Sequence, residues 1–485
     1  MVRIRRDIAS FGEAWPETLI WYAKAVRQLR SLDPNDRNSW AYLGAIHGID
    51  RQGWINDGVI TPQSPMPPQS EQDRMWNQCQ HGTWYFLPWH RGYCWSFEQI
   101  IGATVEALGG PSDWGLPYWN YLDATNPNAR DIPDAFMSAT MPDGSDNPLH
   151  DAERNGLTRL GPSSWYPRDI DLSCMNQHYY TSAVGSLGFG GGVTAFNHFS
   201  GPTGACEGNP HNPVHVMVGG ISPMGWMADP NFAALDPIFW THHCNIDRLW
   251  AAWLTVPGNV QETGANWSDG PSPRQFEMPT SSGQTTVFVP GQTLPGKTYA
   301  PTYDDLTRGT GIGVGPLIAK TVLMEGIEMG ADKGTEGPPA STLIGSSTES
   351  LSTHANAATT AVEMAQGPEM LAKSFEPSRL FLNLEHVRGE TASSVLNVYI
   401  GLPDGHRELA DTLALFGLQK ASQEDGDHAG NGLTYTIDIT GPANKLIASH
   451  DATLDMIEVT IEQPDEAKAA PVTVERISIY SQPAR

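Results

Sequence analysis

Six histidines carry most of the chemistry that this sequence can support. His211 and His215 are four residues apart, so both rings leave the same face if this stretch is helical. His243 shares a helical face with Phe239 and Trp250, and we expect that face to be buried. A buried imidazole needs partners for both ring nitrogens, and a metal ion is one such partner. The full set is His47, His81, His90, His211, His215 and His243.

This set of ligands indicates which metals are suitable. Imidazole binds copper, zinc, iron and nickel, whereas calcium and magnesium prefer oxygen ligands. Two sets of three histidines, with no obvious cysteine or carboxylate ligand, predict two three-coordinate metals with an open face between them. Any one of the six could instead be a hydrogen-bonded core histidine, but that interpretation is poor for all six. His242 is left out, because a residue next to a ligand points about 100° away around a helix.

Predicted helices position most of these histidines. Asp236 and Pro237 have the residue types of a helix N-cap and a first helical residue, so a helix begins there and buries the face of His243. The other predicted helices run from about Ser39 to His47, from Pro88 to Gly109, and from Pro210 to about Gly219.

The chain of 485 residues is too long for one compact core, and its pattern changes along its length. Residues 1–328 hold the helices, the histidines and long loops. Residues 329–373 are rich in Gly, Ala, Ser, Thr, Glu and Pro without periodicity, which predicts a linker. Residues 374–485 alternate with period two and predict an all-β, sandwich-like domain without helices. Its strands are expected at 379–385, 394–400, 433–439, 456–461 and 472–480.

Composition excludes several classes of partner. The net charge of −25 argues against nucleic acid and anionic membranes, which would repel the protein. Five cysteines do not make a disulfide framework in a chain of this size. No segment approaches the roughly 20 apolar residues that span a bilayer. No apolar run follows the N-terminal charges, so we expect a cytoplasmic protein or one whose leader is absent from this sequence.

Three motifs resemble those of a known family. They are His81-Gly-Thr-Trp-Tyr-Phe-Leu-Pro-Trp-His90, His211-Asn-Pro-Val-His215 and Asp236-Pro-Ile-Phe-Trp-Thr-His-His-Cys-Asn-Ile-Asp-Arg-Leu-Trp250. They are similar to the two copper-site signatures of type 3 copper proteins, the family of tyrosinases, catechol oxidases and hemocyanins. The resemblance covers residues 1 to about 325, and the tail resembles the C-terminal domain of the longer polyphenol oxidases. It implies an α-helical, four-helix-bundle dicopper domain with long loops, followed by the β domain.

The resemblance also implies the cofactor and the reaction. One copper is bound by His47, His81 and His90, and the other by His211, His215 and His243. The copper pair binds O2, the co-substrate, and small phenols or catechols are oxidised to o-quinones. Copper suits this role because it changes oxidation state, whereas zinc has no redox chemistry.

Further residues are assigned by the same resemblance. Cys79 lies two residues before His81, and the family often has a Cys–His thioether at this spacing. Phe239 matches a phenylalanine that packs over the copper pair, although a plain core aromatic has the same appearance in sequence. Asp247 lies one turn beyond His243 and is expected to orient Arg248 or a ligand ring, with a purely structural role as the alternative.

Glu207 and Asn212 bear on which phenols react. Asn212 follows His211, and Glu207 lies four residues before that histidine. In tyrosinases a Glu and an Asn so placed are thought to hold a water that deprotonates the phenol. A phenol has a pKa near about 10 and must become a phenolate to bind copper. The alternatives are a helix N-terminal asparagine and a loop carboxylate without catalytic roles.

The tail is expected to cover the copper site as an intramolecular partner. Phe416, in the apolar run Leu413-Ala-Leu-Phe-Gly-Leu418, is the candidate for a side chain that fills the substrate's place. The same run could instead be an inward-facing strand. The leading function is a tyrosinase. The competing functions are a catechol oxidase that does not hydroxylate monophenols, a hemocyanin-like oxygen carrier, and a binding protein with a vestigial metal site.

Overall fold

The computed structural model describes residues 2–154, 156–199, 201–312, 322–323, 337–355, 357–364, 378–424, 430–450, 456–465 and 470–483. The chain divides into two compact units that do not follow chain order. The helical unit comprises residues 1–80, 85–161 and 217–333, and the β unit comprises residues 81–84, 162–216 and 334–485. Two segments that bear histidines therefore group with the C-terminal part of the chain.

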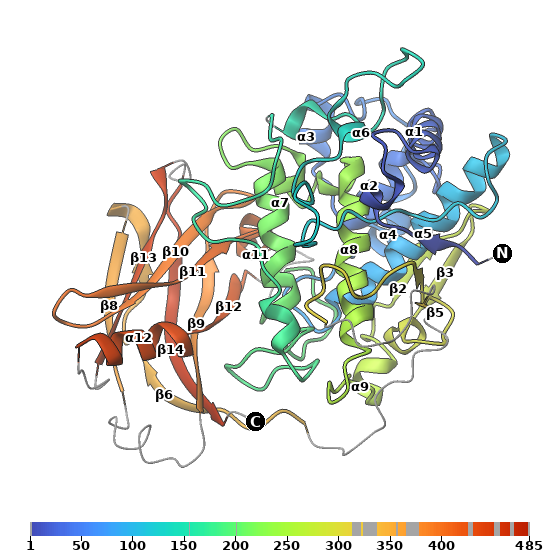
Figure 1. Ribbon diagram of the computed structural model, residues 1–485. Coiled ribbons are helices and arrows are strands. Elements are labelled where there is room, and N and C mark those ends of the chain that lie inside the picture. The colour runs from blue at the N-terminus through green and yellow to red at the C-terminus, as the bar shows by residue number, and fades with distance from the viewer. Residues whose placement is uncertain are drawn as a thin grey trace. The chain divides into compact units, whose positions relative to one another are not determined.

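Three helices of the helical unit agree with the sequence prediction: α2 (Trp40–His47), α5 (Phe86–Ala107) and α8 (Pro237–Trp253) (Figure 1). The Ser39 side chain caps α2, and the Asp236 side chain accepts a hydrogen bond from the Ile238 N–H at the start of α8. Helix α5 begins two residues before Pro88. Proline is tolerated there because the first-turn N–H groups of a helix have no intrahelical partner.

Aromatic side chains hold these helices together. Phe97 of α5 stacks on Trp240 of α8 with ring centroids 3.6 Å apart, and Trp40 of α2 meets Phe97 edge-on at 5.9 Å. Tyr22 meets the same ring at 6.1 Å. Tyr22 lies in α1 (Glu17–Arg30). The remaining helices and strands of this unit are α3 (Arg51–Asn56), α4 (Gln69–Met75), α6 (Asp134–Met137), α9 (Ala265–Ser268), β1 (Ile4–Arg5), β2 (Phe276–Pro279), β3 (Thr285–Phe288), β4 (Thr302–Tyr303) and β5 (Val322–Leu323).

The β unit contains two antiparallel sheets, drawn in orange and red in Figure 1. One has the strand order β11-β10-β13-β8, and the other has the order β12-β9-β14-β6, with β7 paired to β14. The bounds are β6 (Thr342–Ser346), β7 (Leu351–Ser352), β8 (Ala357–Glu363), β9 (Ser378–Arg388), β10 (Val395–Gly401), β11 (Arg407–Ala414), β12 (Leu433–Asp438), β13 (Met456–Glu462) and β14 (Thr473–Pro483). Strand β13 shows the expected alternation, with Ile457, Val459 and Ile461 buried.

The structure corrects two expectations for the tail. Strands β6, β7 and β8 lie within the predicted linker 329–373, of which residues 329–336, 356 and 365–373 are outside the described residues. β6 and β8 each end a sheet, and edge strands carry more polar residues and a weaker apolar alternation. The tail also contains two helices, α11 (Leu418–Ser422) and α12 (Thr440–His450), although the sequence predicted a domain without helices.

A short stretch before the last histidine pair is also more irregular than predicted. A π-helical turn, η4 (Glu207–His211), precedes α7 (Asn212–Gly219), and Asn209 within η4 departs from helical geometry. Across the part of the chain that the structure describes, no helix has the length and hydropathy needed to cross a membrane.

Candidate metal centre

Three of the predicted ligands meet inside the helical unit. His47 ends α2, His90 lies in the second turn of α5, and His243 lies on α8. The rings of His90 and His243 stack with centroids 4.5 Å apart, and His47 lies 5.8 Å from His90 and 6.4 Å from His243. All three side chains are almost completely buried. Three separate helices thus bring their imidazoles together in a buried interior.

Backbone carbonyls fix the orientation of two of these rings. His47 Nδ1 lies 2.9 Å from the Pro230 carbonyl, and His90 Nδ1 lies 2.7 Å from the Phe86 carbonyl. A carbonyl only accepts, so Nδ1 must carry the proton and Nε2 keeps its lone pair. Metal-bound histidines in proteins are usually held in this way. The ring orientations and the all-imidazole donor set therefore fit copper.

Phe239 packs against this cluster from one helical turn before His243. Its ring lies 4.1 Å from the His243 ring and meets His47 edge-on at 5.1 Å. The predicted aromatic therefore contacts the rings of two candidate ligands and is itself fully buried.

The other three predicted ligands meet inside the β unit. His211 and His215 present ring nitrogens within 4.8 Å of one another, and their centroids are 4.5 Å apart. His81 lies 5.7 Å from His211, although about 130 residues separate the two in sequence. The helical spacing of His211 and His215 was visible in the sequence, whereas the approach of His81 depends on the tertiary fold.

Phe416 lies on these same three rings. It stacks on His215 with centroids 4.4 Å apart, and it lies 5.6 Å from His81 and 6.0 Å from His211. It follows β11 and is 2% exposed. The sequence also allowed the apolar run to be an inward-facing strand. Leu413 and Ala414 do lie in such a strand, but Phe416 lies beyond its end.

Glu207 is buried and is held by the backbone next to His81. Its two carboxylate oxygens accept the Gly82 N–H at 2.9 and 3.1 Å. Burial raises the pKa of the Glu207 carboxyl to about 8, although the backbone N–H groups of Gly82 and Gly204 oppose this rise. Glu207 can therefore exchange a proton near neutral pH.

Asn212 joins a ligand to the tail. Its Oδ1 lies 2.8 Å from His211 Nδ1, and its Nδ2 donates to the Tyr435 hydroxyl at 3.3 Å. The first contact orients the His211 ring as the carbonyls orient His47 and His90. Of the two residues assigned to proton transfer, Asn212 thus makes a hydrogen bond to a candidate copper ligand, His211.

Asp247 does not hold Arg248, so the part of the expectation that concerned Arg248 is wrong. Its carboxylate binds Arg5, at 3.0 Å, together with Arg91 and Tyr303. The Arg248 guanidinium binds the side chains of Asn245 and Asn120 instead. All three guanidinium groups are completely buried, and Arg248 finds its partners in the two asparagine side chains while Arg5 and Arg91 offset the cost of burying their charge on the Asp247 carboxylate. These contacts agree with the alternative given above, a purely structural role for Asp247.

His242 and Cys79 lie beside the helical-unit cluster. A ring nitrogen of His242 lies within 4.8 Å of one of His243, while its Nδ1 lies 3.0 Å from the Tyr121 hydroxyl. Cys79 is buried, and its sulfur lies within 4.8 Å of a ring nitrogen of His47. Neither contact contradicts the ligand set predicted from the sequence.

The thioether between Cys79 and His81 remains a prediction with a direct measurement. In copper-loaded protein we expect the peptide that spans both residues to lack two hydrogens, because formation of a C–S bond removes one from each partner. Mass spectrometry of that peptide gives the answer, with Cys79→Ser as the control at full mass. A wild-type peptide of full mass after loading with copper and oxygen rules the thioether out.

Some residues of the site left little trace in the sequence. Phe199 stacks on His81 with centroids 4.2 Å apart and has a positive φ of 82°, which is costly for a residue other than glycine. Tyr435 lies on β12 in a run that alternates like any inward-facing strand. Lys420 Nζ lies 3.1 Å from His198 Nε2 in a buried contact. No local pattern indicates that these three side chains reach the histidines or their neighbours.

Comparisons with known proteins agree with this geometry. A family model described as the common central domain of tyrosinase matches residues 37–256, and one described as a domain of unknown function matches residues 340–482. Tyrosinase HcTyr1 of Hahella sp. (strain CCB-MM4) is 34% identical over 494 residues, which are 96% of this chain and 97% of that protein. Polyphenol oxidase A1 of Vicia faba is 30% identical over 271 residues, which are 52% of this chain and 40% of that protein.

Solved structures share the fold. Latent apple tyrosinase aligns with a TM-score of 0.59 at 18% identity, covering 99% of this chain and 97% of that chain. Recombinant latent aurone synthase, a polyphenol oxidase, aligns with a TM-score of 0.59 at 18% identity, covering 100% of this chain and 90% of that chain. The predicted architecture, a helical dicopper domain followed by a β domain, is confirmed.

The family match and the histidine clusters also establish the cofactor as a dinuclear copper site that uses O2. The 34% identity extends over nearly the whole of both chains. This chain therefore belongs to the tyrosinase and polyphenol oxidase family, and it is a type 3 copper oxidoreductase that acts on phenols.

Proposed function

We propose that this protein is a tyrosinase, which hydroxylates monophenols to o-diphenols and oxidises o-diphenols to o-quinones. The observation that carries the proposal is the buried pair formed by Glu207, whose pKa is raised to about 8, and Asn212, which contacts the ligand His211. The relative from Hahella, similar over almost its whole length, bears the name tyrosinase. An oxidase is supported over an oxygen carrier because the similar proteins are named for phenol oxidation.

The ligand set belongs to the same proposal. His47, His81 and His90 hold one copper, and His211, His215 and His243 hold the other. Copper held there would supply the redox chemistry that couples oxidation of the phenol to reduction of O2. The protein orients the imidazoles through Pro230, Phe86 and Asn212, and it excludes bulk water from the buried rings.

Proton removal from the phenol is the task of Glu207 and Asn212. A monophenol has a pKa near about 10 and must lose its proton before its oxygen can bind a metal ion at neutral pH. A base whose pKa lies nearer to that of the phenol is a better match than an ordinary carboxylate. Glu207 Oε takes the proton through a water, and the Asn212 amide orients that water. Oxidation of a catechol is a separate reaction, in which the catechol loses two protons and two electrons and becomes an o-quinone.

We expect Asn212→Ala to separate the two reactions. Monophenol hydroxylation should fall by about a hundredfold, the typical contribution of a positioned proton-transfer group, while catechol oxidation should fall much less. The measurement is kcat/KM for L-tyrosine and for L-DOPA in the same preparation. Asn209→Ala is the matched control, because the Asn209 Oδ1 accepts the Asp171 N–H and has no part in the proposed step.

Equal losses of both activities in Asn212→Ala mean that the residue acts only through His211. A wild-type protein that oxidises catechols but never hydroxylates monophenols is instead a catechol oxidase. That outcome overturns the proposed monophenol step and keeps the copper chemistry.

The C-terminal β domain is proposed as a lid that keeps the enzyme latent. Phe416, which we call the plug, occupies the face of His215 that an aromatic substrate ring would approach. The next residue must be glycine, because Gly417 has a φ of 79° and a Cβ there would lie 2.2 Å from the Phe199 ring. Arg168 pairs with Asp411, and the Tyr166 hydroxyl donates to the Thr412 carbonyl at 2.9 Å, which anchors the strand that leads to the plug.

A further inference from the structure

Tyr435 joins the plug segment to the proton-transfer residues. Its hydroxyl donates to the Ala414 carbonyl at 2.8 Å and accepts from Asn212 Nδ2 at 3.3 Å. Asn212 in turn contacts His211 Nδ1 at 2.8 Å. Hydrogen bonds therefore run from a residue two positions before Phe416, through one tyrosine, to a candidate copper ligand.

We propose that Tyr435 is an inhibitory positioning residue that occupies, from the C-terminal domain, the place beside Asn212 that the water for phenol deprotonation needs. The inference rests on the proposed function of Glu207 and Asn212. It adds a second level of latency: Phe416 blocks the metal face, and Tyr435 blocks the proton-transfer pair. Hydroxylation of monophenols then requires both side chains to leave, whereas oxidation of catechols requires only the departure of Phe416.

Steric exclusion is the physical basis of this second block. The Tyr435 side chain is 3% exposed, and its oxygen lies within hydrogen-bond distance of Asn212 Nδ2. A water that binds the same N–H from the same side cannot share that position. The carboxylate of Glu207 is also near enough that its charge, after burial, helps to raise the pKa of Tyr435 well above its ordinary value. The tyrosine therefore remains a neutral phenol next to the base and accepts no proton from a substrate.

Tyr435 and the plug are linked through the backbone. Ala414 ends β11 of one sheet, and Tyr435 lies in β12 of the other sheet, so one hydrogen bond fixes the backbone just before Phe416 to the second sheet. Motion that withdraws Phe416 by displacing Ala414 also removes a partner of Tyr435. The two blocks are thereby coupled.

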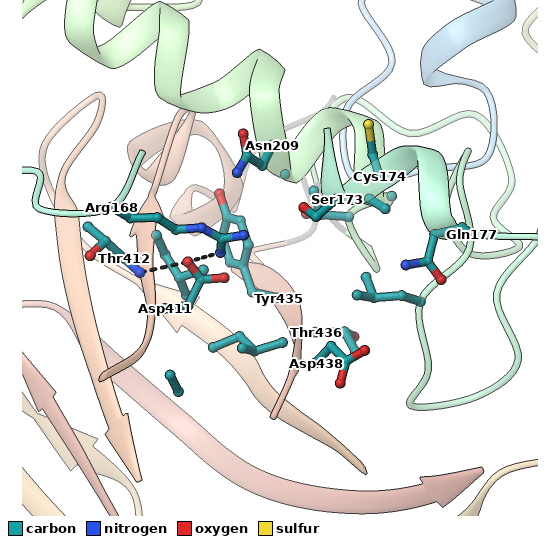
Figure 2. A pocket seen from close by; sticks show the side chains of 18 of the residues that line it. Arg168, Ser173, Cys174, Gln177, Asn209, Asp411, Thr412, Tyr435, Thr436 and Asp438 are labelled. Carbon is teal, nitrogen blue, oxygen red and sulfur yellow. Dashed lines mark hydrogen bonds and ion pairs between the residues drawn. The ribbon is translucent and has the colours of Figure 1, made fainter. Parts of the chain in front are cut away.

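A cavity next to Tyr435 gives its ring somewhere to move. The cavity lies within the β unit and has a volume of about 240 Å³. Figure 2 shows the Tyr435 side chain in its wall, close to Arg168 and Asn209. Ser173 and Thr436 lie in the same wall. The ring can therefore leave Asn212 without displacing a packed side chain on that side.

The test compares two tyrosine hydroxyls of the same unit. Tyr435→Phe removes the contact with Asn212, whereas Tyr166→Phe removes a similarly buried hydroxyl that donates to Thr412 and does not reach Asn212. Both changes are made in the full chain and in Phe416→Ala, and the ratio of L-tyrosine to L-DOPA activity is measured. We expect Tyr435→Phe to raise that ratio about fivefold, the effect of one net hydrogen bond, and Tyr166→Phe to leave it unchanged. An unchanged ratio in Tyr435→Phe, or an equal rise in both variants, overturns the proposal.

Thermal unfolding of the copper-free protein provides a readout that does not depend on activity. Tyr435→Phe and Asn212→Ala should each lower Tm by about 2–4 °C, and the double variant should lower it by clearly less than the sum of the two shifts, because both single variants lose the same hydrogen bond. Additive shifts mean that the two side chains do not interact, which contradicts the inference. The proposed function is judged separately: it fails if Asn212→Ala lowers both activities equally, whatever the result for Tyr435.

Discussion

Replacing His243 by alanine should abolish phenol oxidation, down to the level of the copper-free protein. His243 stacks on His90 at 4.5 Å and lies against Phe239, so its loss removes one of three imidazoles from a proposed copper and leaves a hole beside a second ligand ring. A site with two protein ligands binds copper more weakly and holds it in the wrong geometry for the paired reaction. The measurements are copper per chain by elemental analysis and the rate of quinone formation from L-DOPA. We expect wild type to hold two coppers and His243→Ala to hold fewer.

His242→Ala is the matched control, because it removes the neighbouring buried imidazole from the same helix. The His242 Nδ1 contacts the Tyr121 hydroxyl, so its loss should lower stability but retain two coppers and measurable oxidation. Loss of copper in His242→Ala together with its retention in His243→Ala would show that the ligand assignment on α8 is wrong. Fully active wild-type protein with zinc or a single copper would overturn the dicopper site altogether.

Replacing Phe416 by alanine should raise catechol oxidation by the full chain by about tenfold or more. The substitution removes the stacking on His215 and the contacts with His81 and His211, and it leaves space for a substrate ring. One aromatic stacking contact contributes up to about 1.5 kcal/mol, which corresponds to roughly a tenfold change in the fraction of open molecules. The measurement is kcat/KM for catechol and for a bulkier catechol, because the space of one side chain should favour the smaller substrate.

Phe381→Ala distinguishes removal of the plug from general loosening of the β unit. Phe381 is fully buried in β9 and pairs in that sheet with β12 and β14. Its loss should destabilise the domain without clearing the histidines, so catechol oxidation should rise much less than in Phe416→Ala. Equal activation by both variants would mean that any weakening of the domain opens the enzyme, and no activation by Phe416→Ala would end the proposal that this side chain is the plug.

The local sequence determined the helices and the residue types of the metal site. Asp236-Pro237 and Ser39 begin helices in the structure where capping chemistry predicts them, because a cap depends only on neighbouring residues. The spacing of His211 and His215 likewise acts within one helical turn. The motifs around His81, His90 and His243 were long enough to indicate copper chemistry before any fold was known.

Tertiary structure decided the partners of these residues. Asp247 binds Arg5 and Arg91 and not Arg248, since the deciding factor is which buried guanidinium lies closest in space. The raised pKa of Glu207 follows from burial that no sequence window reveals. Strands β6 and β8 were hidden because edge strands need no strict apolar alternation.

The grouping of distant segments also arises only in the folded chain. Residues 81–84 and 162–216 belong with the C-terminal part, so His81 and His211 share a compact unit with Phe416 and Tyr435. Nothing in the alternation of β12 distinguishes Tyr435 from another inward-facing residue, because a hydroxyl finds its acceptor across space and not along the chain. The sequence therefore determined which chemistry the protein carries, and the fold decided which side chains from the tail lie on that chemistry.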